Sequence, residues 1–184
     1  MDDQHYIKET LRGNTKAYEV LVNRYKDMVY AIAFQFSFSK EDSKELAQNI
    51  FVKVFENLGS FKSSAKFSTW LYRIAYNTAI SEYNKQKRKS YFTELDEHTH
   101  PEDLALHALD NMIVNEQKAL LECEVKKLPP EEQALIHFFY HENLPVAEIS
   151  SIANISESNV KTKLFRIRQK LATAMKSVLY EKTN

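Results

Sequence analysis

The sequence predicts an all-α protein made of two small helical domains joined by a flexible acidic linker. Only two Gly and four Pro occur among 184 residues, and 43% of the residues are hydrophobic. Few helix breakers and many long side chains favour helices. The apolar residues also recur at spacings of three and four, which is the helical period. We place the first domain at residues 1–90, the linker at 91–115 and the second domain at 116–184.

The first domain is predicted to be a bundle that begins with two amphipathic helices. The first carries an apolar stripe at Ala17, Leu21, Tyr25, Met28, Ile32 and Phe36. The second is expected to begin between Ser39 and Asp42, because serine is a good N-cap. Its stripe is Leu46, Ile50, Val54 and Leu58. We expect Gly59 to end it in the left-handed conformation that glycine adopts without strain.

The third helix of this bundle, KFSTWLYRIAYNTAISEYNKQKRK at 66–89, carries more aromatic rings than one core stripe needs. At 100° per residue, Phe67, Leu71, Ile74 and Thr78 share the core face. Trp70 lies on a second face with Arg73, Asn77 and Asn84, and Tyr72, Tyr76 and Tyr83 lie on a third. Accessible rings beside cations suit stacking on unpaired bases. For each ring taken singly, core packing is the favoured interpretation. For Trp70, core packing and contact with nucleic acid are equally favoured.

The linker and the start of the second domain are marked by changes in composition. The stretch FTELDEHTHPED is polar and acidic and lacks helical periodicity. A helix is possible over 102–127. A further helix is predicted at LPPEEQALIHFFYHENLP, since Pro130 suits a first helical turn and the two glutamates suit the positive end of the helix dipole.

The last segment has the spacing of a helix-turn-helix. Ser150 is small where two helices would cross, and Asn154 tolerates the left-handed turn conformation. Ser156 is a suitable N-cap for a second helix. That helix has a buried stripe at Val160, Leu164, Ile167, Leu171 and Met175. Its remaining surface is basic, as docking in a major groove requires.

Composition and charge narrow the class of protein. No stretch approaches 18 consecutive apolar residues, so we expect no membrane insertion. The single Cys123 and the absence of a signal-peptide pattern favour the cytoplasm. The formal net charge is zero, but KQKRK at 85–89 and the cations at 161–176 form two basic blocks on either side of an acidic stretch. Two such blocks suggest two surfaces that meet one polyanion.

Three other functions compete with that interpretation. His137 and His141 are four residues apart and could ligate a metal, but no third ligand is placed, so no metal or other cofactor is predicted. A dimeric helix-turn-helix regulator would explain residues 129–176 and leave the aromatic helix unexplained. A protein-binding helical module is the third.

Two stretches carry a family resemblance. The run from SKELAQNIFVKVFENLGSFKSSAKF to TWLYRIAYNTAISEYNKQKRK resembles region 2 of bacterial extracytoplasmic-function (ECF) sigma factors. The run LPPEEQALIHFFYHENLPVAEISSIANISESNVKTKLFRIRQKL resembles their region 4. The resemblance implies a non-enzymatic promoter-specificity subunit of RNA polymerase. Region 2 would bind the polymerase clamp helices and the −10 element, and region 4 the flap and the −35 element.

The resemblance also implies sets of site residues. The polymerase-binding set is Asp42, Glu45, Gln48, Asn49 and Lys53. The set for the melted non-template strand of the −10 element is Phe61, Lys62, Ser63, Ser64, Ala65, Lys66, Thr69, Trp70, Arg73, Tyr76, Asn77, Lys85, Lys87 and Arg88. The set for the −35 duplex is Ser158, Asn159, Lys161, Thr162, Lys163, Phe165 and Arg166. An anti-sigma factor is the further partner that the family implies.

The chain departs from the usual family pattern at several positions. Asn49 stands where Glu is usual, Ser81 where Asp is common and Asn84 where Arg is common. Ser158 and Asn159 replace the usual Gly-Thr pair before Val160. The promoter sequence of the family is therefore not transferred to this chain.

Overall fold

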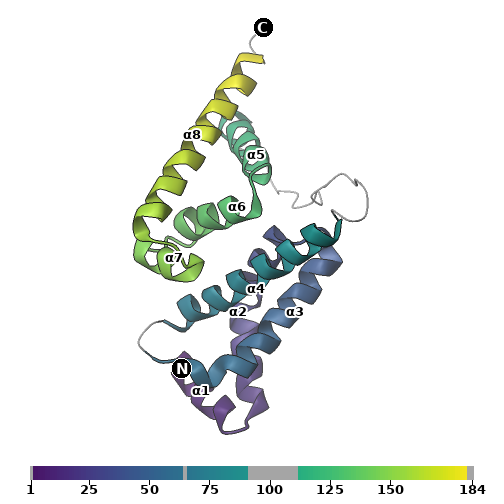
Figure 1. The fold of residues 1–184 in the computed structure, drawn as a ribbon, viewed down its shortest axis with the longest axis vertical. Helices are drawn as coiled ribbons and strands as arrows, with labels where there is room; N and C mark the ends of the chain where they lie inside the picture. Colours follow the sequence, from purple (N-terminus) through teal and green to yellow (C-terminus); the bar gives the residue numbers. More distant parts are fainter. Residues whose placement is uncertain (1, 64–65, 91–111, 182–184) are drawn as a thin grey trace. The chain divides into compact units, whose positions relative to one another are not determined.

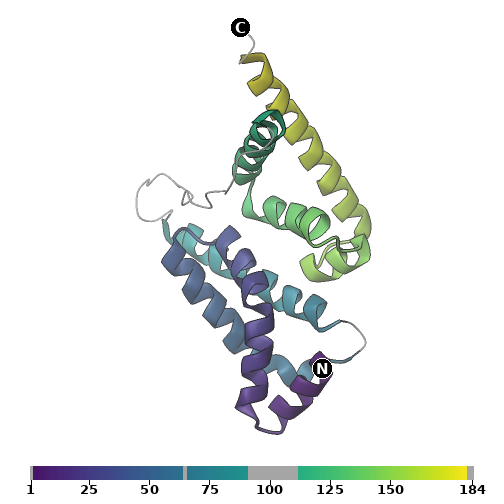
Figure 2. The same cartoon turned by 180° about the vertical axis from the view of Figure 1, so that it is seen from behind.

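A computed structural model describes residues 2–63, 66–90 and 112–181, and the chain divides into two compact helical units (Figure 1). Throughout these residues the ordered elements are helices, which confirms the all-α prediction. The reverse view shows that α1 and α2 of the first unit lie side by side (Figure 2).

The first unit is a bundle of three long helices and one short one. The elements are α1 (Asp3–Leu11), α2 (Thr15–Gln35), α3 (Lys40–Asn57), η1 (Leu58–Ser60) and α4 (Phe67–Ser90). Helices α2, α3 and α4 pack against one another, and α1 packs on α2. Their shared core includes Val29, Ile32, Ile50, Ala75 and Ala79, all with no exposed surface. The predicted start of α3 is confirmed, because the Ser39 hydroxyl accepts a hydrogen bond of 3.0 Å from the Asp42 amide.

Two details of this unit differ from the sequence prediction. Gly59 was expected to end α3 in the left-handed conformation, and this is wrong, because α3 runs on into the 3₁₀ turn η1. Among the described residues, the glycine with a positive φ is Gly13, at 97°, in the turn between α1 and α2. Helix α1 itself was not predicted. Its Ile7 and Thr10 are buried.

The second unit contains α5 (Met112–Lys126), α6 (Pro130–Ile136), the π-helical turn η2 (His137–His141), α7 (Val146–Ala153) and α8 (Glu157–Glu181). Helix α8 packs on both α5 and α6. The predicted helix start at Pro130 is confirmed. The Gln133 side chain closes the turn before it by donating hydrogen bonds to the carbonyl oxygens of Leu128 (2.7 Å) and Lys126 (3.1 Å). Helix α5 begins at Met112, inside the predicted linker, and residues 102–111 of the possible helix lie outside the described residues.

His137 should make the stability of the second unit depend on pH. Burial lowers the pKa of His137 below its ordinary value of 6.5; the Glu142 carboxylate, 3.4 Å from Nε2, raises it, and neighbouring His141 lowers it. Below about pH 6.5 the unfolded chain therefore binds a proton that folded His137 does not. The free energy of unfolding should be fully retained above that pH and should fall as the pH drops through the window below it.

Urea unfolding at a series of pH values between 7.5 and 5 measures this change. His137→Gln should show a weaker loss of stability on acidification than the parent protein, whatever its stability at pH 7.5. Equal pH dependence in the two proteins would contradict the assignment to His137.

Candidate nucleic-acid interface

The turn between α7 and α8 has the geometry of a helix-turn-helix. Asn154 has φ of 54°, which confirms the left-handed conformation predicted for it. The Ser150 hydroxyl donates a hydrogen bond of 2.5 Å to the Ile155 carbonyl oxygen across this turn. The Ser156 hydroxyl accepts a hydrogen bond of 3.2 Å from the Asn159 amide and so caps α8, as predicted. Together these contacts fix the direction in which α8 leaves the turn.

Helix α8 separates its apolar and polar residues cleanly. Val160, Leu164 and Ile167 are at most 1% exposed and Leu171 is also buried, as the sequence predicts, whereas Met175, the last residue of the predicted stripe, is half-buried. The predicted −35 residues lie on the other side of the helix. Those exposed to solvent are Ser158, Asn159, Lys161, Thr162, Phe165 and Arg166, and Lys163 is half-buried. Phe165 is 57% exposed, so an apolar ring lies among cations on an open surface.

Four cations of α8 differ in whether they contact other elements of the unit. Lys170 forms an ion pair of 2.8 Å with Glu132 of α6, and the Arg168 guanidinium lies 5.9 Å from the centroid of the Phe139 ring. These two side chains hold α8 on the rest of the unit. For Lys161 and Arg166, by contrast, the structure records no ion pair with any residue that it describes. Their charges are available to an anionic partner.

In the first unit, an aromatic cluster stands at the start of α4. Trp70 lies 5.5 Å from Phe61 and 5.6 Å from Phe67 between ring centroids, and Phe61 lies 5.5 Å from Phe67. Phe67 is buried, whereas Phe61 and Trp70 are half-buried and keep part of their surface in solvent. Arg73 and Asn77 follow Trp70 at helical spacing and are exposed. This face of α4 combines a partly open indole ring with a cation and an amide.

The loop before α4 contributes polar and charged groups to the same end of the helix. Lys62, Ser63 and Lys66 are exposed. Ser64 and Ala65, which were also predicted to contact the −10 strand, lie outside the described residues.

Several α4 residues that were considered for an accessible face are buried. Tyr72 and Tyr76 are 2% and 5% exposed, which agrees with core packing, the interpretation favoured for each ring taken singly, and leaves Tyr76, a member of the predicted −10 set, without an open face. The Tyr76 ring packs edge-on against Phe36 at 5.7 Å. Thr69 is also buried, at 8% exposed. Helix α4 packs on both α2 and α3 and therefore buries two of its faces, so Tyr76 and Thr69 belong to the interior of the unit.

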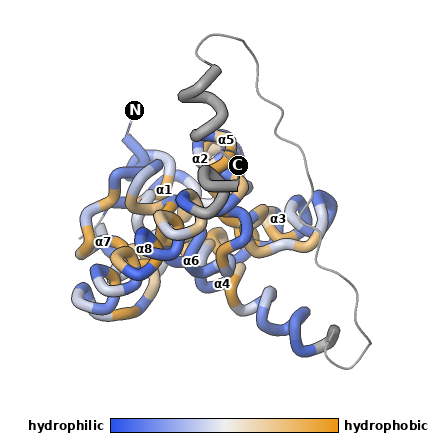
Figure 3. Tube along the Cα trace, turned by 90° about the horizontal axis from the view of Figure 1, so that it is seen from above, coloured by the Kyte–Doolittle hydropathy of each residue, from blue (hydrophilic) through white to orange (hydrophobic). Residues whose placement is uncertain are grey.

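The C-terminal turns of α4 are hydrophilic, and Figure 3 shows them in blue. Lys85, Lys87 and Arg88 are exposed there. Lys85 lies 3.5 Å from Glu82, and the Arg88 Nε donates a hydrogen bond of 3.1 Å to the Asn84 carbonyl oxygen. The aromatic start and the basic end of α4 are thus two chemically distinct surfaces of one helix.

A groove of about 300 Å³ runs between α3 and α4. Four of the five predicted polymerase-binding residues line it: Asp42, Glu45, Asn49 and Lys53. Gln48 is exposed on α3. Glu56 and Glu82 also line the groove, which makes it predominantly acidic. Its negative charge repels the phosphate backbone of DNA.

The histidine pair weighed as a metal site occupies the first and last positions of the second unit's η2 turn. The rings of His137 and His141 stack with centroids 5.5 Å apart. Within the described residues, no group of three or more His, Cys, Asp or Glu side chains is arranged to hold a metal ion. His98, His100 and Asp103 of the acidic linker, whose spacing predicts no fixed metal site, lie outside those residues.

Comparison with known families identifies both units. Residues 21–89 match the family model of sigma-70 region 2, and residues 118–171 match that of sigma-70 region 4. The chain belongs to the sigma-70 family, in its ECF group. This confirms the resemblance seen in the sequence. Helix α1 precedes the region 2 match.

Relatives of this sigma factor extend over nearly the whole chain. It is 29% identical to the ECF sigma factor SigW of Bacillus subtilis, over 94% of this chain and 96% of the relative. It is 26% identical to the sigma-H factor of Pseudomonas aeruginosa, over 97% and 96%. CnrH, solved with the cytosolic domain of CnrY, superposes with a TM-score of 0.65 at 19% identity, over 95% of this chain and 97% of CnrH, and supports the fold.

The sigma factor is an RNA polymerase subunit that binds the core enzyme, recognises the −35 and −10 promoter elements and promotes strand opening. Among the helices that the structure describes, none is long and apolar enough to cross a membrane.

Proposed function

We propose that this sigma factor divides promoter recognition between two of its helices. The exposed face of α8, with Lys161, Phe165 and Arg166, docks in the major groove of the −35 element. The aromatic start of α4 holds a base of the separated −10 strand. The observation that carries the proposal is the exposed basic face of α8 opposite a fully buried stripe, on a helix fixed by a helix-turn-helix.

The proposed −10 step needs no covalent chemistry, so we assign no enzymatic activity. Extruding a base from the duplex costs a few kcal/mol. Stacking on Trp70 and backbone contacts from Lys62, Lys66 and Arg73 offset that cost when the base fits. Ser63, Ser64, Ala65 and Asn77 complete the proposed −10 surface, and Lys85, Lys87 and Arg88 contact the backbone upstream. Strand opening and sequence recognition then occur as one event.

The proposed polymerase surface is the groove between α3 and α4. Its lining includes the carboxylates of Asp42 and Glu45 and the amide of Asn49. These groups, with Gln48 and Lys53, would hold the clamp helices of the polymerase, and region 4 would hold the flap. A protein that acts on the polymerase works in the bacterial cytoplasm.

An anti-sigma factor is a further proposed partner. A solved sigma factor of the same fold, RpoE of Bartonella quintana, forms a complex with the anti-sigma factor NepR. It superposes on this chain with a TM-score of 0.64 at 18% identity, over 88% of this chain and 98% of RpoE. We propose that a protein of this class also binds the present sigma factor.

Substitutions on α8 test the −35 assignment through the salt dependence of binding. Lys161→Ala and Arg166→Ala should each weaken binding of the polymerase holoenzyme to −35 duplex DNA. Each should also reduce the magnitude of the slope of log affinity against log salt concentration by about one. The reason is that a variant that makes one phosphate contact fewer releases fewer counterions when it binds the DNA. Fluorescence anisotropy at several salt concentrations gives both quantities.

The matched control is Lys170→Ala, since this cation on the same helix is already paired with Glu132. It should leave the slope nearly unchanged. A slope unaffected in both Lys161→Ala and Arg166→Ala would exclude a groove-docked α8.

A further inference from the structure

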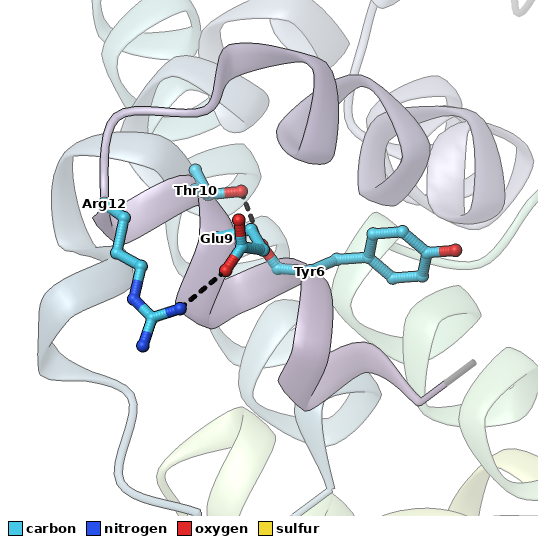
Figure 4. Close-up of polar contacts among 4 residues, drawn as sticks. All are labelled: Tyr6, Glu9, Thr10 and Arg12. Carbon is cyan, nitrogen blue, oxygen red and sulfur yellow. Dashed lines mark hydrogen bonds and ion pairs between the residues drawn. The ribbon is translucent and has the colours of Figure 1, made fainter.

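Helix α1 is tied to α2 by polar contacts at its start. At its start, the Asp3 carboxylate accepts a hydrogen bond of 2.5 Å from the Tyr25 hydroxyl and pairs with the Arg24 guanidinium. Arg24 also lies 5.4 Å from the centroid of the Tyr6 ring. At its end, Thr10 donates a hydrogen bond of 2.7 Å to the Tyr6 carbonyl oxygen and Arg12 pairs with Glu9 at 2.8 Å, and both contacts lie within α1 and its C-cap (Figure 4). A nine-residue helix would not persist alone in water, so these contacts and its buried Ile7 maintain it.

Tyr25 connects α1 to the aromatic cluster of the −10 surface. Its hydroxyl bonds to Asp3, and its ring packs edge-on against Phe67, with centroids 5.5 Å apart. Phe67 contacts both Phe61 and Trp70. A chain of direct contacts therefore runs from Asp3 through Tyr25 and Phe67 to Trp70.

The chemistry of Tyr25 keeps this connection intact. Burial, and then the neighbouring Asp3 carboxylate, raise the pKa of the Tyr25 hydroxyl well above its ordinary value. The phenol therefore remains a hydrogen-bond donor at physiological pH, and a charged acceptor makes its bond stronger than a neutral one would. The ring of Tyr25 is held at its far end by Asp3 while its edge meets Phe67.

A second contact reaches the same region from the other end of α1. Leu11 lies beside η1, its Cδ2 3.8 Å from the position that a β-carbon on Gly59 would occupy. The turn η1 directly precedes Phe61 in the chain, and the Phe61 amide donates a hydrogen bond of 3.1 Å to the Leu58 carbonyl oxygen. Both ends of α1 thus approach elements that set the position of the aromatic cluster.

We propose that α1 is a positioning element for the −10 surface, and that Asp3 and Tyr25 are positioning residues that act on Trp70 through Phe67. The inference rests on the proposed role of Trp70 in holding a −10 base. Neither Asp3 nor Tyr25 needs to touch DNA: they restrict the geometry of the rings that do. Base discrimination, rather than overall DNA affinity, is the property that they control.

Trp70 is the single tryptophan of the chain, so its fluorescence reports on the cluster without DNA. The variants are Tyr25→Phe, which keeps the ring and removes the hydroxyl, and Asp3→Ala. We expect both to change the Trp70 emission maximum and to increase its quenching by acrylamide. The control is Tyr30→Phe, which lies on α2 like Tyr25. The Tyr30 ring packs against Phe34 rather than against Phe67. This variant should leave the emission unchanged.

Base discrimination is measured with the holoenzyme on a pool of promoters randomised at the −10 element. The measured quantity is the ratio of opened complexes that carry the preferred base to opened complexes that carry any other base. Both variants should lower this ratio about fivefold, the fold-change that corresponds to the roughly 1 kcal/mol contributed by one hydrogen bond. Affinity for core polymerase and for −35 duplex DNA should not change. The double variant should be no worse than Asp3→Ala alone, because both substitutions remove the same bond.

The outcomes separate this proposal from the one on which it rests. Unchanged emission and unchanged discrimination in Asp3→Ala and Tyr25→Phe would overturn the positioning role, as would an equal loss of polymerase affinity and discrimination. If Trp70→Ala itself leaves discrimination unchanged, the −10 assignment fails. Altered emission in Asp3→Ala and Tyr25→Phe would in that case still show that these residues act on Trp70 through the chain of contacts, and unaltered emission would refute it.

Discussion

Trp70→Ala is expected to weaken promoter opening at least tenfold while leaving the affinity for core polymerase nearly unchanged. Stacking of a base on an aromatic side chain contributes about 1–3 kcal/mol, and 1.4 kcal/mol corresponds to a factor of ten. Trp70 keeps part of its ring in solvent, beside exposed Arg73, and so can offer that stacking surface. The groove between α3 and α4, which is the proposed polymerase-binding surface, does not include Trp70. Opening is measured with a fluorescent base analogue in the −10 element, and polymerase affinity in a separate titration.

Loss of packing must be distinguished from loss of stacking in this variant, because Trp70 also touches Phe61 and Phe67. Trp70→Phe keeps a ring and should retain most of the opening activity. Trp70→Leu keeps apolar volume without a π-face and should open promoters as poorly as Trp70→Ala. If polymerase affinity falls as far as opening does, Trp70 has a structural role and the assignment to the −10 strand is incorrect.

The sequence predicts the helix-turn-helix unit well because each of its signals is local. Asn154 tolerates a positive φ, Ser156 caps the next helix, and Pro130 begins another; each position depends on its own neighbours in the chain. The buried stripe on α8 is also easy to predict, because only one face of this helix is buried and the opposite face stays in solvent. Periodicity then identifies both the buried and the exposed side correctly.

The aromatic helix was harder to predict because its surroundings are not local. A helical wheel separates the faces of α4, but it cannot state how many of them are covered. Helices α2 and α3 cover two, which buries Tyr72 and Tyr76 and leaves the Trp70 face partly open. The only cue in the sequence was the position of Arg73 and Asn77 on the same face as Trp70, because polar groups of this kind mark solvent.

Helix α1 escaped prediction for a related reason. It has nine residues, and helices so short depend on tertiary contacts rather than on their own propensity. Its Asp3 depends on Arg24 and Tyr25, some twenty residues away in the chain. The sequence contains a weak helix signal here: Ile7 and Leu11 are four residues apart and follow two aspartates.

Tyr76 provides the opposite test, because it resembles a DNA-contacting residue in the sequence and lies in the core of the structure. Tyr76→Ala should lower the free energy of unfolding by about 3–5 kcal/mol, as large-to-small substitutions of buried aromatic residues do. Its ring packs against Phe36, and the cavity left by the substitution would lie between helices that carry both the proposed polymerase-binding groove and the proposed −10 surface. Polymerase affinity and promoter opening should therefore fall together at 37 °C, and both should recover at lower temperature.

The conservative variant decides between core packing and DNA contact at this position. Tyr76→Phe keeps the packed ring and should cost no more than about 1.5 kcal/mol, the net contribution of one hydrogen bond. It should bind polymerase and open promoters like the parent protein. If Tyr76 stacked on DNA, Tyr76→Ala would instead remain folded and lose opening alone. Urea unfolding beside the opening assay separates the two cases: buried residues of α4 change stability, and residues on its open face change base recognition.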